Sequence, residues 1–376
     1  MLLREVIGHE AAKALFRQML ASGRLPHALL LLAPPGAGAL PLAWALAQRS
    51  LCTSPREDDA CGECDHCRKA AKLVHPDFHF SFPTVGTKVT SDQFLSQWRE
   101  ALLDNPYLEI NDWLQRIGAE NKQGNINKEE CVNIVRKISL KSFESDQKIL
   151  LMWLPEYLGN EGNRLLKLIE EPPERTTFIL VAENQELILN TILSRCQLVK
   201  LPALADETIA SALQAQRGLN QETAEAIAHL ADGNYNDALV MAQQQDHDQA
   251  KRFLEWMRCC YKGHPVEMTD WVDDFAGIGR ENQKHFLRYA LHFWREFLIL
   301  KTLGPERTRL RPNELKTATG MTKVLSLAQL ETIVQLLDAC SEHVSRNAHP
   351  RVLFLDASIR IHRIFKQPKN QNQTAA

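Results

Sequence analysis

Three short runs of apolar residues constrain the fold of this chain more than any other feature. Residues 28–33 (Ala-Leu-Leu-Leu-Leu-Ala), 148–154 (Lys-Ile-Leu-Leu-Met-Trp-Leu) and 177–182 (Thr-Phe-Ile-Leu-Val-Ala) have the length of strands and do not alternate apolar with polar side chains. Continuous apolar strands are typical of a parallel sheet that is covered by helices on both faces. Because helical patterns lie between the runs, the sequence predicts an α/β fold with crossover helices.

The pattern becomes entirely helical after residue 203. Short helices are predicted over 205–217 and 221–231, and longer amphipathic helices follow from about residue 250 to residue 365. The last residues are polar and have no apolar surface to bury, which predicts disorder. We therefore expect an α/β domain at 1–203 with a cysteine module at about 50–75 and an insertion at about 85–125, a small helical domain at 204–247, an all-helical domain at 248–366 and a disordered tail at 367–376.

Length and charge exclude several classes of protein. The chain has 376 residues, enough for two or three compact cores. Its 44 Lys and Arg residues and 46 Asp and Glu residues leave a net charge of −2, without the basic excess that non-specific nucleic-acid binding needs. Met1 to Glu5 lack the basic and apolar segments of a secretory signal, so we expect a cytoplasmic protein with no membrane partner.

A glycine-containing loop follows the first predicted strand. Residues 33–40 (Ala-Pro-Pro-Gly-Ala-Gly-Ala-Leu) lie where a phosphate-binding loop would read G-x-x-x-x-G-K-[ST]. In such a loop backbone N–H groups surround the phosphates, the lysine pairs with phosphate oxygens and the hydroxyl holds Mg²⁺. Ala39 and Leu40 replace the lysine and the hydroxyl residue, and one lost charge-assisted hydrogen bond removes about 1.5–3 kcal/mol. We expect no bound cofactor at this degenerate loop, whose residues include Gly36, Gly38, Ala39 and Leu40.

The second predicted strand carries a related loss. A nucleotide-hydrolysing site of this type needs an apolar strand that ends in acidic residues, but this strand ends in Trp153 and Leu154. Both the phosphate loop and the end of the second strand thus lack the residues that ATP binding and hydrolysis need. When the loop is taken alone, an unrelated strand, turn and helix with chance glycines stays an alternative.

Four further motifs occur in a fixed order along the first domain. They are Gly8-His9-Glu10, residues 23–28 (Gly-Arg-Leu-Pro-His-Ala), residues 163–173 (Asn-Arg-Leu-Leu-Lys-Leu-Ile-Glu-Glu-Pro-Pro) and residues 191–196 (Thr-Ile-Leu-Ser-Arg-Cys). Together with the altered loop, they resemble the AAA+ subunits of the bacterial DNA polymerase III clamp loader, and within that family the delta-prime type. The resemblance covers residues 1–203 apart from the insertion, and it continues more weakly through 233–239 and 346–350.

This resemblance implies an AAA+ P-loop NTPase-like domain, a helical lid domain and a helical collar domain through which loader subunits associate. Family members that hydrolyse ATP have an intact phosphate loop, acidic residues after the second strand and a lid arginine, whose position is Asn236 here. The resemblance therefore implies a non-hydrolysing delta-prime-like subunit in DNA replication, which is not an enzyme by itself. The implied partners are gamma/tau-like and delta subunits, the sliding clamp, and primed-template DNA held by the complex.

Ser194, Arg195 and Cys196 form the motif that the resemblance identifies as an arginine finger. In clamp loaders this arginine is donated in trans to ATP held by a neighbouring subunit, where the guanidinium stabilises charge on the γ-phosphate. The interpretation gives Arg195 a catalytic role in trans, with Ser194 and Cys196 beside it. A surface arginine next to a strand is the alternative.

Four of the nine cysteines lie within sixteen residues, in the spacing Cys-x₈-Cys-x₂-Cys-x₂-Cys. Four soft thiolate ligands suit Zn²⁺ in a closed tetrahedral site, which is structural because no position is left for water. Unmodified thiols, a disulfide pair and an iron–sulfur cluster are the alternatives. The resemblance supports zinc, since clamp-loader subunits carry a similar module, and it leaves His66 and His75 as bystanders. The predicted ligands are Cys52, Cys61, Cys64 and Cys67.

Two other functions stay open from the sequence. One is an ATP-hydrolysing gamma/tau-like subunit with an atypical site, and the other is a zinc-dependent nucleic-acid-binding module. Basic residues gather at 301–323, where they form either a solvated face or a strip that faces DNA or a partner.

Overall fold

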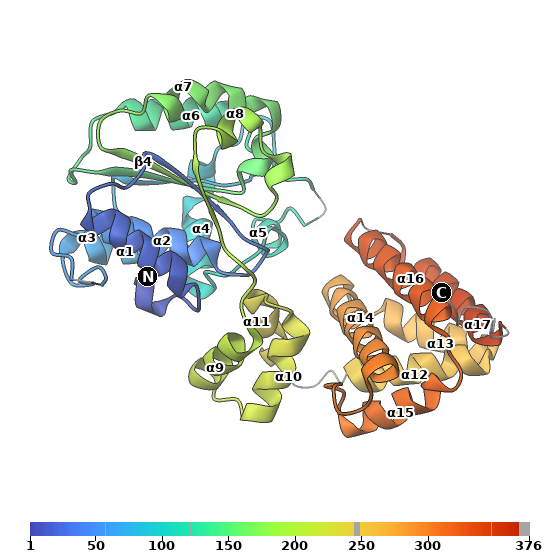
Figure 1. Cartoon of the computed structure of the whole chain (residues 1–376). Helices are drawn as coiled ribbons and strands as arrows, with labels where there is room; N and C mark the ends of the chain where they lie inside the picture. The colour runs from blue at the N-terminus through green and yellow to red at the C-terminus, as the bar shows by residue number, and fades with distance from the viewer. Residues whose placement is uncertain (57, 121, 244–248, 347, 368–376) are drawn as a thin grey trace, which may run out of the picture. The chain divides into compact units, whose positions relative to one another are not determined.

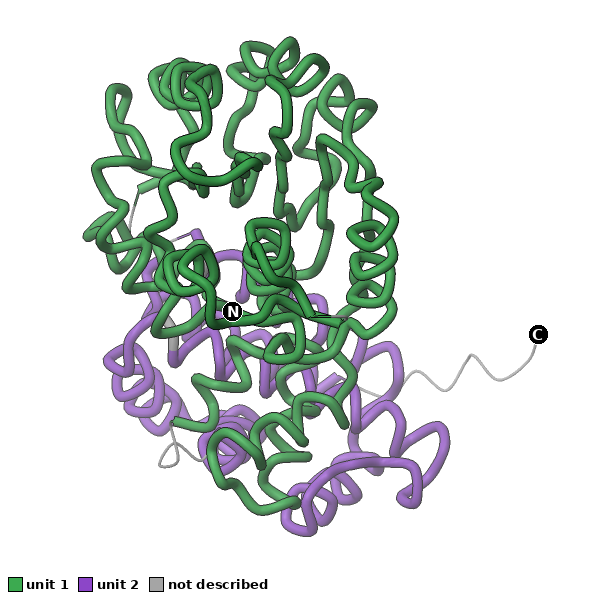
Figure 2. The backbone as a smooth tube through the Cα atoms, turned by 90° about the vertical axis from the view of Figure 1, so that its left-hand side faces the viewer, with its two compact units in different colours: residues 1–243 green, residues 244–376 purple. Residues whose placement is uncertain are grey.

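The computed structural model describes residues 1–56, 58–120, 122–243, 249–346 and 348–367. These residues fall into two compact units, 1–243 and 244–376 (Figure 2). The expected end of the small helical domain at residue 247 and the expected tail beyond residue 367 lie outside the described residues. None of the helices in the described ranges is long and apolar enough to cross a membrane.

Parallel strands form a five-stranded sheet in the first unit, in the spatial order β2-β3-β4-β1-β5. They are β1 (Ala28–Leu32), β2 (Phe78–Ser81), β3 (Lys148–Trp153), β4 (Thr176–Ala182) and β5 (Gln197–Lys200). The three predicted apolar runs are the three central strands, and every residue of β3 and β4 is buried. The predicted parallel sheet is therefore confirmed, with β2 and β5 as additional strands at its two edges.

Helices cover both faces of this sheet (Figure 1). Leu29 and Leu31 pack on one face with α1 (Glu10–Ala21), α2 (Ala39–Leu51), α4 (Leu95–Asp104) and α5 (Ile110–Arg116). Leu30 packs on the other face with α6 (Lys128–Ser139), η3 (Pro155–Leu165), α7 (Leu166–Glu170) and α8 (Asn190–Leu193). Shorter elements are η1 (Leu3–Glu5), α3 (Asp65–Ala71), η2 (Ser91–Phe94) and η4 (Gln185–Leu187).

The segment expected as an insertion at about 85–125 contributes to the central core. It contains η2, α4 and α5, and the indoles of Trp98 and Trp113 are fully buried. Both rings contact Phe82, at centroid distances of 4.3 and 4.9 Å. Because these aromatic side chains bury large areas, they fix the segment against the sheet. This fixed position matters for the contacts of the loop after β1, described below.

Three helices form a small lid that belongs to the first compact unit. They are α9 (Asp206–Arg217), α10 (Gln221–Ala231) and α11 (Tyr235–Gln243), and the first two match the helices predicted from the sequence. Their hydrophobic cluster also contains Ile7 and Tyr107 from outside the lid. The lid is thus joined to the sheet domain by shared packing.

The second unit consists of helices throughout its described residues. They are α12 (Gln249–Lys262), α13 (Pro265–Ala276), α14 (Arg280–Leu303), α15 (Pro312–Thr322), α16 (Leu327–Ser345) and α17 (Pro350–Lys366). On α14 the apolar side chains of Phe286, Phe293 and Phe297 are buried, and Phe293 lies 4.8 Å from Phe253 of α12. On α16 the buried apolar residues begin at Leu330, because Leu327 at the start of the helix is 49% exposed. The predicted fold class, α/β plus all-α, is confirmed.

Candidate functional site

The loop after β1 has the shape of a phosphate-binding loop without its chemistry. It ends at the N-terminus of α2, and Gly36 and Gly38 take left-handed φ values of 64° and 101°. Ala39 and Leu40 are buried and belong to the apolar core of the sheet domain. The two positions that would offer a cation and a Mg²⁺ ligand therefore present only hydrocarbon to the protein interior.

The lid and its neighbours lie directly against this loop. The backbone N–H of Tyr235 donates to the Gly36 carbonyl at 3.0 Å. A Cβ atom on Gly36 would lie 1.8 Å from Asn234 Oδ1, and one on Gly38 would lie 2.9 Å from Tyr107 Cε1. Side chains of this protein thus touch both glycines of the loop at distances that leave no room for another atom.

The first motif of the sequence holds the same loop from a third side. His9 Nε2 donates to the Ala37 carbonyl at 2.6 Å. The Ile7 N–H donates to the Tyr107 hydroxyl at 2.9 Å, and the Tyr107 ring meets that of Tyr235 edge-on at 4.9 Å. Burial raises the pKa of the Tyr107 phenol, so the hydroxyl keeps its proton. Tyr107 consequently joins the N-terminal segment, the phosphate loop and the lid.

Polar side chains close the lid onto the helix-containing segment at 105–112. Asn105 Nδ2 donates to Asn236 Oδ1 at 2.6 Å, and Asn236 Nδ2 donates to Asp112 Oδ2 at 2.8 Å. Asn234 Nδ2 donates to Glu109 Oε1 at 2.6 Å. We call these five residues, with the Tyr235–Gly36 hydrogen bond, the lid latch. Asn236 stands where the resemblance expects a phosphate-sensing arginine. Its side chain is 4% exposed and takes part in two hydrogen bonds of the lid latch.

Acidic side chains gather at the carboxyl ends of the central strands, although not in the expected positions. Trp153 and Leu154 at the end of β3 are buried, and the acid comes two residues later. Glu156 Oε1 accepts the N–H groups of Glu183 and Asn184, just after β4. Burial, followed by the charges of Glu109 and Glu156, raises the pKa of Glu183 to about 8.

Arg195 lies between α8 and β5, with its guanidinium held by its own chain. Nε and Nη2 donate to Glu170 Oε2 at 3.0 and 2.9 Å, and Nη1 donates to the Thr191 carbonyl at 2.9 Å. Ser194 Oγ is a weaker acceptor for Nη1, at 3.4 Å. Burial raises the pKa of Cys196 to about 11, so its thiol stays protonated and cannot act as a nucleophile at neutral pH.

The sheet topology separates Arg195 from the phosphate loop of the same chain. β5 runs parallel to β1, with Gln197 opposite Leu29 and Lys200 opposite Leu32. Arg195 precedes the start of β5, whereas the phosphate loop follows the end of β1. The arginine and the loop therefore lie at opposite ends of the sheet.

The four predicted ligand cysteines come together in one cluster. Their sulfur atoms all lie within 4.8 Å of one another. The Cys52–Cys61 and Cys61–Cys67 sulfur distances are 3.5 and 3.8 Å. Four sulfurs at about 2.3 Å from Zn²⁺ in a tetrahedron are separated by about 3.8 Å, so the cluster fits a structural zinc site.

Burial raises the pKa of Cys52 and Cys67, whereas at Cys61 and Cys64 hydrogen bonds that include backbone N–H donors outweigh burial and lower the pKa. The N–H groups of Cys61 and Cys64 donate to the sulfurs of Cys52 and Cys61, each at 3.3 Å. Burial alone would raise the pKa of Cys64, but hydrogen bonds from the Cys67 backbone and from Thr53 outweigh it and lower the pKa to about 6. A thiolate is the form that binds zinc.

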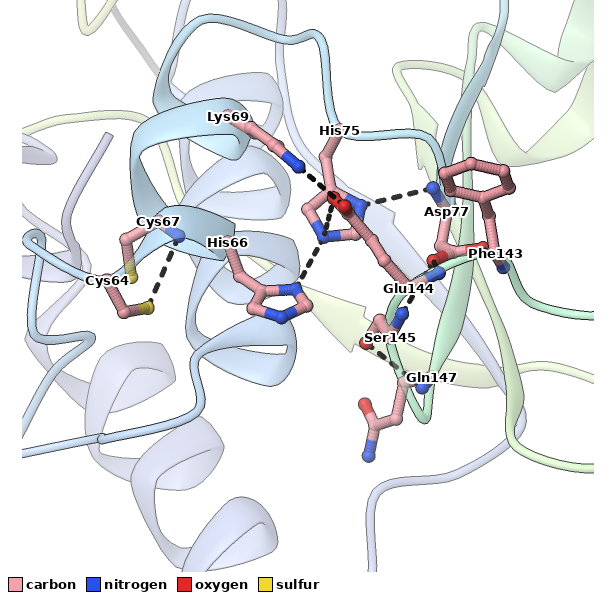
Figure 3. A network of polar contacts seen from close by, with 10 residues as sticks. All are labelled: Cys64, His66, Cys67, Lys69, His75, Asp77, Phe143, Glu144, Ser145 and Gln147. Atoms are coloured by element: carbon pink, nitrogen blue, oxygen red, sulfur yellow. Dashed lines mark hydrogen bonds and ion pairs between the residues drawn. The ribbon is translucent and has the colours of Figure 1, made fainter.

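A polar network joins the cysteine module to the sheet (Figure 3). His66 Nδ1 and His75 Nε2 are 2.8 Å apart, and Lys69 pairs with Glu144 at 2.5 Å. The Asp77 N–H donates to His75 Nδ1 at 3.1 Å, which leaves the proton of neutral His75 on Nε2. Because that nitrogen carries a proton, the network acts as a hydrogen-bonded contact, and both histidines lie outside the sulfur cluster.

The sequence revealed only part of this constellation. The phosphate loop, the cysteine cluster and the Ser-Arg-Cys motif were all predicted. The latch residues at 105–112 and the acceptor Glu170 were not assigned a role, because no local pattern marks them. Tyr107 is an aromatic residue in a polar segment, which is the one signal that could have drawn attention to it.

The parallel sheet, the turn from β1 into α2 and the helical lid define the class of this chain as an AAA+ P-loop NTPase-like fold. A family model described as DNA polymerase III, delta subunit, matches residues 8–205, more than half of the chain. The chain belongs to this family. The resemblance to clamp-loader subunits of the delta-prime type is thereby confirmed.

Curated relatives agree with this membership. The DNA polymerase III subunit delta' of Escherichia coli is 26% identical over 71% of this chain and 69% of its own length. The subunit delta' of Haemophilus influenzae is 28% identical over 66% of this chain and 64% of its own length. Among solved structures, a DNA polymerase III gamma subunit-related protein from Thermotoga maritima is 12% identical, with coverage of 95% of this chain and 99% of that one and a TM-score of 0.41.

Proposed function

We propose that this chain is a clamp-loader subunit that binds and hydrolyses no ATP of its own and donates Arg195 to ATP held by an adjacent gamma/tau-like subunit. The observation that carries the first half is the lid latch. It holds the lid on the phosphate loop through side chains of the protein itself, in the place where a nucleotide would otherwise link the two parts. The apolar positions Ala39 and Leu40 support the same conclusion.

Electrostatics also favours a site without nucleotide. Glu109, Glu156 and Glu183 lie near the end of the strands that would face the phosphates, and burial, followed by the charges of Glu109 and Glu156, raises the pKa of Glu183. ATP would bring several negative charges without the lysine that normally compensates them. Hydrolysis would further need a Mg²⁺ ligand and a water-positioning acid, for which Leu40 and Trp153 offer no chemistry.

The topology supports action of Arg195 in trans. Because Arg195 and the phosphate loop lie at opposite ends of the sheet, this arginine cannot reach a nucleotide on its own loop. Its side chain is 30% exposed, so it is accessible to a neighbouring molecule. In a ring of subunits, a guanidinium at this end can stabilise the charge that develops on a γ-phosphate held by the next subunit.

The wider role follows from the family. We propose that the chain works with gamma/tau-like and delta subunits to load the sliding clamp onto primed-template DNA in the cytoplasm. Its near-neutral charge suits protein contacts, with DNA held by the assembled complex. Zinc at the cysteine cluster has a structural role in this proposal, as do the lid and the C-terminal collar at 204–247 and 248–366.

The decisive experiment replaces the arginine in a reconstituted clamp loader. Arg195→Ala should leave assembly unchanged and lower the DNA-stimulated ATP turnover of the neighbouring site by about 10³-fold or more, since an arginine finger contributes about 10³–10⁵ in kcat. Arg175→Ala is the matched control, because Arg175 is also an exposed arginine in an ion pair, with Asp146. Equal ATP turnover in the Arg195→Ala and wild-type complexes would refute the finger assignment.

A further inference from the structure

The guanidinium of Arg195 is held on two sides by the chain that carries it. Its side edge, formed by Nε and Nη2, faces one oxygen of Glu170 at 3.0 and 2.9 Å. Its Nη1 group faces the Thr191 carbonyl at 2.9 Å. Both acceptors belong to short, fixed elements, since Thr191 lies in α8 and Glu170 is the last residue of α7.

These contacts leave one edge of the guanidinium for a ligand. An arginine has five N–H groups, and a planar anion or a phosphate is bound in a fork by two of them. Glu170 takes Nε–H and one hydrogen of Nη2, and the Thr191 carbonyl takes one hydrogen of Nη1. The other hydrogen of Nη2 lies on the end edge, and no contact within the described part of the chain engages it, whereas Nη1 has a further, long contact to Ser194 Oγ at 3.4 Å.

Glu170 is well placed to orient Arg195 without withdrawing it. The carboxylate is 57% exposed and the guanidinium is 30% exposed, so their ion pair is screened by water and is weak. A doubly charged γ-phosphate competes easily with such a pair, and it approaches a different edge. The ion pair limits the rotamers of the Arg195 side chain, and this reduces the conformational entropy that the side chain loses when it binds a phosphate.

We propose that Glu170 is a positioning residue for Arg195: it holds the side edge of the guanidinium so that the end edge faces the γ-phosphate of the neighbouring subunit. This inference rests on the proposed function. It assigns a role to the Glu-Glu-Pro-Pro end of α7, where Pro172 and Pro173 stop the helix and fix the carboxylate beside the finger.

The test uses the full chain in a reconstituted clamp loader and measures kcat and KM for ATP in the presence of primed DNA. Glu170→Gln should lower kcat at the neighbouring site by about tenfold, with KM for ATP little changed, because orientation matters most in the transition state. Glu171→Gln is the matched control. Glu171 is the next residue and is also exposed, and none of the contacts that Arg195 makes among the residues described by the structure involves it, so wild-type turnover is expected.

A double substitution separates positioning from a general structural effect. If Glu170 acts only through Arg195, Glu170→Gln should lower kcat no further, within about twofold, in an Arg195→Ala complex. A tenfold loss that persists in that background would overturn the proposal, as would unchanged or increased turnover in Glu170→Gln alone. If Arg195→Ala itself has no effect, the finger assignment fails, and the positioning role fails with it. Equal melting temperatures and equal assembly of all variants exclude misfolding as the cause.

Discussion

Restoring the chemistry of the phosphate loop should not restore ATP binding. The variant Ala39→Lys/Leu40→Thr supplies the lysine and the hydroxyl that the loop lacks, but it leaves the lid latch in place. Opening the latch breaks four hydrogen bonds, two to the carboxylates of Glu109 and Asp112 and two between uncharged groups. At about 1.5–3 kcal/mol for a bond to a charged group and about 0.5–1.5 kcal/mol for a neutral one, the sum is at least about 4 kcal/mol.

This energy sets the apparent affinity. If opening the lid latch costs about 4 kcal/mol before ATP can bind, a site with an intrinsic Kd of about 1 μM has an apparent Kd of about 1 mM. Titration of the purified variant with Mg-ATP, followed by calorimetry, should therefore detect no binding in the micromolar range. A melting curve of the same variant controls for the loss of core packing at Leu40.

The companion variant removes the latch as well. Adding Asn234→Ala and Asn236→Ala to the restored loop deletes three of the four hydrogen bonds, and we expect the apparent Kd to fall by about 300-fold, as the loss of about 3.5 kcal/mol requires. Micromolar ATP binding by the variant with an intact latch would refute the reasoning. Equal failure of both variants would show that the latch is not the barrier.

Two further outcomes are expected. Asp77 accepts the N–H groups of Phe143, Glu144 and Ser145, and although its burial acts in the opposite direction, these bonds lower the pKa of its carboxyl. The stabilisation by the Asp77 carboxylate is therefore complete above the ordinary Asp pKa of about 3.9 and is lost as pH falls through the lower pKa of the folded state. At neutral pH, Asp77→Ala should lower the free energy of unfolding by about 2–5 kcal/mol. In urea melts at acid pH, the difference between the variant and the wild type should become smaller. A difference that is independent of pH would contradict this. Removal of the metal with a chelator, or the substitution Cys64→Ser, should lower the melting temperature and expose residues 50–75 to proteolysis. Metal analysis of the untreated protein should find about one Zn²⁺ per chain. A zinc content near zero in the native protein would exclude the site.

Burial on both faces is what made the central strands predictable. β1, β3 and β4 have continuous apolar sequences, because every side chain enters one of the two cores. β2 escaped prediction since its four residues, Phe-His-Phe-Ser, are too short and too mixed to stand out. Its strand conformation comes from pairing with β3, which is a tertiary interaction.

The candidate sites divide along the same line. The cysteine cluster was predictable because metal ligands keep a short and regular spacing. The latch was not, since Asn105 and Asn236 are 131 positions apart and neither residue type carries a signal for pairing. The contact between Glu170 and Arg195 could not be predicted either. Both residues belong to motifs that carry the family resemblance, but their contact depends on how α7 and α8 pack. Asn236 alone was singled out in advance, as a missing arginine rather than as a member of a latch.

The lid helices are 9 to 12 residues long, and isolated helices of this length are marginal in water. The lid helices are stabilised by contacts with other parts of the first unit: Ile7 and Tyr107 belong to their hydrophobic cluster, and the phosphate loop accepts a hydrogen bond from Tyr235. We expect the lid and the sheet to unfold as one cooperative unit, so that amide exchange of α11 requires the opening of the whole domain. A lid that opens locally to exchange nucleotide would instead show faster amide exchange in α11 than in the central strands.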